Sequence, residues 1–206
     1  MVLGAKTVVK MKPELTFDQW VEKVFAGEPP SFDWMWENAL DPTKAEWLVT
    51  YPTRLFEEPE FLIDRYSDEQ LRKGFWNLPN SWELRDSIWG KELPWTLRKS
   101  CIQSMVPLFE KFFSRNPLGD TCYMWWDALR YFGDDGEERV VDEIFLALKK
   151  TLFLDSLDCQ GAALHGLGHL DHSEKRSVIN KYLKEHPDLD PKLRQYAIHC
   201  LEGKVL

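Results

Sequence analysis

The stretch Gly161-Ala-Ala-Leu-His-Gly-Leu-Gly168 decides how the fold is interpreted, because two other segments of the chain share its pattern. Trp126-Asp-Ala-Leu-Arg-Tyr-Phe-Gly133 aligns with it, and so does Tyr196-Ala-Ile-His-Cys-Leu-Glu-Gly203. The aligned alanines are 35 and 34 residues apart. A helix pair repeated at this interval is typical of an α-solenoid, in which each pair buries its apolar face against its neighbours.

The segment between the first two copies supplies the second helix of such a pair. It carries one apolar stripe at helical spacing, formed by Val141, Ile144, Phe145, Leu148 and Leu152. An apolar stripe of this kind is the pattern of an amphipathic helix that packs against a core. Alternating runs and Asn-Gly hairpins are absent, so we predict an all-α chain.

Helix start and stop signals recur along the chain. Thr16–Gln19 and Ser67–Gln70 have the pattern of capping boxes, and Asp41 and Asp190 each precede a proline at the first helical position. Pro52 and Pro107 should end or kink their helices, while Gly27 and Gly203 suit C-caps. We expect helices over residues 16–26, 31–40, 43–56, 67–77, 82–89, 95–115, 120–132, 137–153, 157–171, 174–185 and 191–202.

The small and aliphatic residues of Gly161–Gly168 resemble the second helix of a HEAT-type repeat. The resemblance is closest to the short form found in phycobilisome-lyase-like proteins, and it covers residues 119–203. It implies an α-α superhelix of antiparallel helix pairs with a concave binding face. A tetratricopeptide array has a similar period, but its ordered Trp, Gly and Tyr pattern does not occur here. The Asp/Arg ladder of well-formed HEAT repeats is also missing.

The N-terminal and C-terminal parts of the chain differ in composition. All ten Trp lie between Trp20 and Trp126, and ten of the twelve Pro lie at or before Pro117. We therefore expect a single α-helical domain over 1–206. Its predicted parts are a flexible arm over 1–14, an irregular Trp-rich helical half over 15–118, and HEAT-like repeats over 119–206.

Composition narrows the functional classes. Lys and Arg total 26 against 34 Asp and Glu, and the net charge of −8 disfavours nucleic acid and favours a basic partner. No apolar run approaches the ~18–20 residues of a membrane span, and no secretory signal is evident. The cysteines form no CxxC pair, so we expect reduced thiols and a cytoplasmic protein. They are Cys101, Cys122, Cys159 and Cys200.

These features predict a non-enzymatic protein- or peptide-binding solenoid, for example an inhibitor or immunity-type protein that masks a basic partner. The nucleophile elbow GxSxG, the P-loop and GxGxxG are all absent, and we expect no cofactor. The adjacent Trp125 and Trp126 point about 100° apart on a helix, so we expect at most one of them to be fully in the core and the other to lie on the surface of the concave face. With Asp127 and Arg130 they are the predicted partner-binding residues of this segment.

A second functional class rests on the histidines. His165, His169 and His172 fall within about 60° of one another on a helical wheel, and His199 lies in the next copy. These four can contribute to the partner-binding face, can be surface or packed histidines, or can chelate a borderline metal such as Zn²⁺. The HExxH motif of metalloproteases is absent.

A weaker alternative is base excision. The Trp, Asp and Arg set of residues 125–130 on a HEAT-like scaffold is loosely similar to the helical alkylpurine DNA glycosylases. In those enzymes an aromatic side chain stacks on the damaged base and a carboxylate supports its excision. They need a basic channel, whereas this chain is acidic.

Overall fold

The computed structural model describes residues 16–26, 46–130 and 137–205. These three ranges are helical and contain no strand, which confirms the all-α class. The helices are α1 (Phe17–Phe25), α3 (Trp47–Glu57), η1 (Pro59–Leu62), α4 (Asp68–Asn80), α5 (Trp82–Trp89), α6 (Trp95–Leu108), η2 (Phe109–Phe113), α7 (Asp120–Tyr123), α8 (Trp125–Ala128), α9 (Glu138–Leu152), α10 (Leu157–His169), α11 (Lys175–Glu185) and α12 (Pro191–Leu201).

Capping explains where several helices begin. Thr16 and Ser67 form the predicted capping boxes with Gln19 and Gln70. The Asp190 side chain accepts from two backbone N–H groups at the start of α12, as its position before a proline predicts. Gly203 has a φ of 66° just past α12, which confirms the expected left-handed C-cap. The predicted arm over 1–14, helix over 31–40 and caps at 27 and 41 lie outside the described residues.

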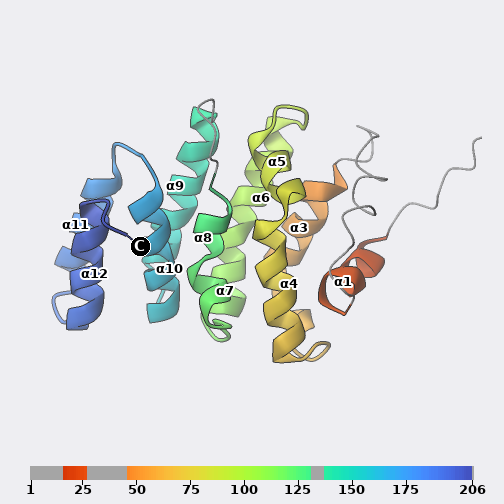
Figure 1. Cartoon of the computed structure of the whole chain (residues 1–206), viewed down its shortest axis with the longest axis horizontal. Coiled ribbons are helices and arrows are strands. Elements are labelled where there is room, and N and C mark those ends of the chain that lie inside the picture. Colours follow the sequence, from red (N-terminus) through yellow and green to blue (C-terminus); the bar gives the residue numbers. More distant parts are fainter. Residues whose placement is uncertain (1–15, 27–45, 131–136, 206) are drawn as a thin grey trace, which may run out of the picture.

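The helices stack in two layers (Figure 1). In one layer α3 packs on α6, α6 on α9, and α9 on α11; in the other α4 packs on α7 and α8, these on α10, and α10 on α12. The layers meet where α9 packs on α10 and α11 on α12. Helices therefore contact neighbours both within their own layer and in the other layer, and each buries its apolar stripe between the two layers.

The two prolines expected to end or kink their helices lie in different contexts. Helix α3 continues past Pro52 to Glu57, whereas α6 ends at Leu108, directly after Pro107, and the next five residues form the π-helix η2. A proline removes one backbone donor, and the buried positions around both prolines outweigh that loss. The helix expected over 120–132 is instead divided into α7 and α8 at Met124.

The division at Met124 buries both tryptophans that follow it. Helix α8 lies between α4 and α10, so side chains that leave it in different directions meet protein on both sides. Trp125 packs edge-on against Phe56, with ring centroids 5.4 Å apart, and Trp126 stacks on Phe109 at 5.3 Å. The relative exposures are 0% for Trp125 and 3% for Trp126. The expectation that one of them lies on the surface is therefore wrong.

Small residues let α10 approach α8 and α9 closely. A Cβ atom on Gly166 would lie 2.6 Å from Cδ2 of Leu148 and 2.7 Å from Cβ of Trp126. By contrast, a Cβ on Gly161 meets nothing within 4 Å. Gly166 is thus the contact point that brings α8 and α10 together, and it sets the position of the residues described next.

Among the described residues, we find no helix with both the length and the apolar character that crossing a bilayer requires.

Candidate functional site

Two helices bring three potential ligand atoms together. One atom each from Asp127, His165 and His169 lie within 4.8 Å of one another. His165 and His169 are four residues apart on α10 and so share a face, with ring centroids 4.7 Å apart. Asp127 comes from α8, which packs against α10. We call these three residues the polar cluster.

His165 is the most deeply placed member of the polar cluster, with an exposure of 0%. Its Nδ1 lies 2.7 Å from the hydroxyl of Tyr196, and that hydroxyl lies 2.6 Å from the hydroxyl of Tyr123. Its Nε2 is buried and has no hydrogen-bond partner within the described part of the chain. A buried polar nitrogen without a partner is costly, so this atom is a candidate to bind something the chain does not itself supply.

His169 connects the polar cluster to Arg130. Its Nδ1 lies 2.9 Å from Nη1 of Arg130, and its Nε2 lies 3.8 Å from Oδ1 of Asp127. A guanidinium only donates hydrogen bonds, so Nδ1 of His169 accepts and Nε2 carries the ring proton. Nε of Arg130 also lies 3.6 Å from Oδ1 of Asp127. Arg130 therefore sits beside the polar cluster as a cation, and its side chain is 37% exposed.

Burial and the neighbouring charges favour the neutral form of both imidazoles. Burial lowers the pKa of His165 most, followed by the neighbouring His169 and, more weakly, Arg130, while Asp127 acts in the opposite direction. Burial also lowers the pKa of His169 most; Asp127 opposes this, and Arg130 and Lys175 add to it. A neutral imidazole is the form that binds a metal ion.

The ligand types of the polar cluster suit a borderline divalent ion. Two imidazoles and one carboxylate form a set that holds Zn²⁺ or Fe²⁺ in proteins. Ligand atoms on one zinc ion lie roughly 3.0–3.5 Å apart. The ligand atoms of the polar cluster lie within 4.8 Å of one another, so the distances between them must shorten by about 1 Å when an ion binds. Rotation about the side-chain torsions of Asp127 and His169 can supply that change.

The structure does not bring the other two predicted histidines to the polar cluster. Helix α10 ends at His169 and the next residue is extended, so His172 leaves the helical face. Its ring stacks on Phe145 at 3.7 Å, and its Nε2 lies 3.3 Å from Asp142. His199 is exposed on α12, beside Gln195. Of the four histidines, only His165 and His169 therefore lie in the polar cluster, and His172 is separated from them because α10 ends at His169.

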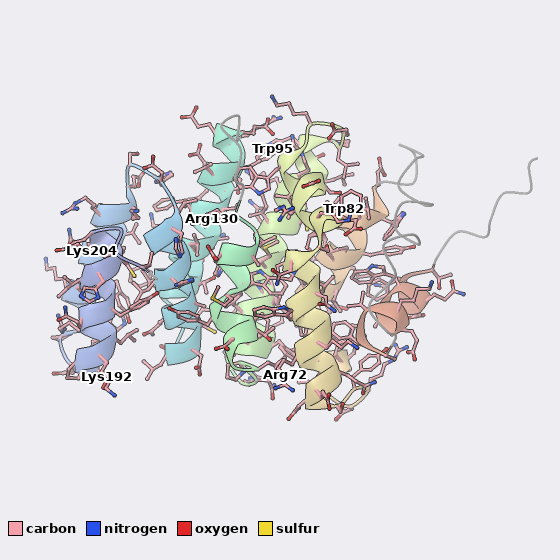
Figure 2. The ribbon with its side chains drawn as sticks, in the orientation of Figure 1. Arg72, Trp82, Trp95, Arg130, Lys192 and Lys204 are labelled. Carbon is pink, nitrogen blue, oxygen red and sulfur yellow. The ribbon has the colours of Figure 1, made fainter. Side chains whose placement is uncertain are left out.

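A pocket of about 230 Å³ opens beside the polar cluster. His169 belongs to both the pocket and the polar cluster, and Arg130, beside the cluster, also lines the pocket. Figure 2 shows Arg130 just past the end of α8, close to α9 and α10. The remaining lining is mostly apolar: Trp89, Trp126, Val141, Ile144, Leu148, Gly166 and Leu170, with Asp171 as a further polar residue.

The sequence singles out every residue of the polar cluster, but it does not indicate that Asp127 lies beside the two histidines. Asp127 and Arg130 stand next to the tryptophan pair, whereas His165 and His169 stand in a separate helix. The contact that joins the two groups is the close approach at Gly166. Its only sequence signal is a glycine between two histidines on one helix.

No protein-family model, no curated protein and no solved structure matches this chain.

Proposed function

We propose that the chain binds a divalent metal ion, Zn²⁺ or Fe²⁺, through Asp127, His165 and His169. The observation that supports this most is the pairing of two buried atoms that lack a hydrogen bond within the described ranges, one of which, Oδ1 of Asp127, has only the longer contacts to Arg130 and His169. Oδ1 of Asp127 and Nε2 of His165 both lie out of contact with solvent, and neither has a hydrogen-bond partner among the residues described. Both are ligand types for such an ion, and both lie within 4.8 Å of a ring nitrogen of His169.

Arg130 has to move for the ion to bind. A metal on Nε2 of His169 requires the ring proton on Nδ1, where a guanidinium cannot accept a hydrogen bond. If the ion uses Nδ1 instead, Arg130 occupies its place at 2.9 Å. The partial exposure of the Arg130 side chain gives it a path into solvent. In this proposal Arg130 is a resident cation that gives up its contact with His169 when the metal binds and remains at the edge of the site.

Calorimetric titration of the chelator-treated protein with Zn²⁺ tests the proposal. We expect one equivalent to bind, and we expect Asp127→Asn to weaken binding by about tenfold or more, because it removes the anionic ligand. His165→Gln should weaken it further. Matched controls are Asp158→Asn and His199→Gln, which alter exposed residues outside the polar cluster and should leave binding unchanged. Circular dichroism establishes that each variant is folded. Absence of binding, or equal binding by Asp127→Asn, overturns the proposal.

A second candidate function is the masking of a basic protein partner. One surface favours it, which we call the acidic edge: the exposed residues Glu57, Glu58, Glu60, Phe61, Ile63 and Asp64 around η1. Phe61 and Ile63 are 41% and 42% exposed, and carboxylates flank them on both sides in sequence. Arg54 and Arg65 line the same hollow as Phe61, so the four carboxylates of the acidic edge are partly offset by two cations. Apolar side chains with a net acidic surround suit a basic protein.

In this second proposal the chain is a HEAT-like α-α superhelix that acts as an inhibitor or immunity-type protein. We place it in the cytoplasm, because free thiols such as those of the four buried cysteines persist there. Affinity capture tests it with the double variant Phe61→Ser, Ile63→Ser, and with Leu157→Ser as control, since Leu157 is 61% exposed on α10. We expect a basic protein to be captured by the wild type and the control, and to be released by added salt. Capture that resists salt, or that survives the double variant, contradicts this function.

A further inference from the structure

The pocket beside the polar cluster is apolar along most of its wall. Val141, Ile144 and Leu148 contribute from α9, and Trp126 closes the side toward α8. An apolar cavity of about 150 Å³ is large enough for benzene. At about 230 Å³ this pocket is therefore large enough for an aromatic ring or a short alkyl chain.

The polar end of the pocket has a defined charge once a metal is bound. His169 is shared between the pocket and the polar cluster, so an ion held there lies at the edge of the apolar wall. A dication, the Asp127 carboxylate and the Arg130 guanidinium sum to a positive charge, which Asp171 only partly offsets. Three protein ligands also leave coordination positions open for another molecule.

We propose that this pocket binds a small amphipathic carboxylate, with its apolar tail against the α9 wall and its carboxylate on the metal ion and Arg130. The inference rests on the proposed metal site and names the class of molecule that this site takes. Arg130 has a role in both states: it contacts His169 in the structure described here, and it pairs with the carboxylate after the metal displaces it.

The alkyl tail contributes to the affinity through the apolar area that it buries, and the carboxylate contributes through its charge. The two contributions can therefore be measured separately. Hexanoate and 1-hexanol share an alkyl chain, but only hexanoate carries an anion. Losing one charge-assisted contact corresponds to about tenfold or more in affinity. Trp89 and Trp126 line the pocket and report its occupation through their fluorescence, while Co²⁺ reports on the coordination positions through its visible absorption.

The experiment is a titration of the Co²⁺-loaded protein with hexanoate and 1-hexanol, followed by both signals. We expect hexanoate to change both the tryptophan fluorescence and the Co²⁺ absorption. We expect the affinity for 1-hexanol to be lower by about tenfold or more. Val141→Phe should fill part of the pocket and weaken hexanoate without loss of Co²⁺. Its control is Leu146→Phe, because Leu146 is on the same helix, is 44% exposed and does not line the pocket.

Equal binding of the acid and the alcohol, or unchanged hexanoate binding in Val141→Phe, overturns the inference. Uptake of Co²⁺ with no response to hexanoate overturns this inference alone and leaves the metal site standing. A failure to take up Co²⁺ overturns the metal site and the carboxylate pocket together.

Discussion

The hydroxyl of Tyr196 lies 2.7 Å from Nδ1 of His165, and thereby fixes which nitrogen of that ring faces the polar cluster. The same hydroxyl contacts Tyr123 at 2.6 Å, so a chain of hydrogen bonds runs from α12 and α7 to α10. Metal-binding histidines in proteins are commonly held in this way through their second nitrogen.

Tyr196→Phe should weaken Zn²⁺ binding by about 10- to 100-fold, because the His165 ring loses the partner that orients it. The control is Tyr182→Phe, since Tyr182 also donates a buried hydrogen bond, at 2.6 Å to Gln160, but away from the polar cluster. Calorimetric titration measures both. Equal effects of the two variants would contradict a role for Tyr196 in positioning His165.

Arg130→Met should strengthen Zn²⁺ binding. The substitution removes the cation that contacts His169 and Asp127, and a hydrogen bond to a charged group is worth about 1.5 kcal/mol or more, or roughly tenfold in affinity. Arg72→Met, at an exposed position on α4, is the control and should have no effect. Weaker binding by Arg130→Met would show that the guanidinium supports the ion rather than competing with it.

Glu137→Gln should destabilise the fold and should alter its response to acid. Arg98 is 1% exposed and donates to Glu137 at 2.6 Å, and this hydrogen bond is the main reason that the pKa of Glu137 is lowered. Loss of the carboxylate leaves a buried cation and should cost about 2–3 kcal/mol at neutral pH, allowing for the partial exposure of Glu137.

A carboxyl with a lowered pKa stabilises the folded state above its ordinary pKa, and that contribution is lost as the pH falls through the lowered value. The difference between the wild type and Glu137→Gln should therefore narrow below about pH 4.5. Urea unfolding at several pH values measures it, with the exposed neighbour Glu138 changed to Gln as control. A difference that does not depend on pH would contradict the ion pair as the cause.

The two glycines of α10 should respond to alanine in opposite directions. Gly161→Ala meets no neighbour and should stabilise the protein by about 0.5–1 kcal/mol through helix propensity. Gly166→Ala places its Cβ against Leu148 and Trp126 and should destabilise it by about 1–3 kcal/mol. Urea unfolding measures both. Stabilisation by both variants would mean that α8 and α10 do not approach at Gly166.

The sequence predicted much of the fold because its signals are local. The capping boxes at Thr16 and Ser67 and the apolar stripe of α9 depend on residues three or four apart, and each appears where expected. The arrangement of the site could not be predicted in this way, because it depends on contacts between helices that are distant in sequence. Trp125 and Trp126 are both buried because α4 and α10 flank α8, and nothing within the segment itself encodes those neighbours.

The histidine set failed for a related reason. The spacing of His165, His169 and His172 suits one helical face only if the helix continues, and α10 ends at His169. Asp127 replaces the missing ligand from a helix nearly forty residues earlier in the chain, a pairing that depends on the packing at Gly166.

X-ray absorption spectroscopy of the protein loaded with one equivalent of Zn²⁺ tests the central claim most directly, because imidazole rings give distinctive scattering beyond the first shell of ligands. The account predicts two imidazole ligands, with light oxygen ligands completing the coordination, and the loss of one imidazole in His165→Gln. A spectrum with no imidazole, or one unchanged by His165→Gln, would contradict it.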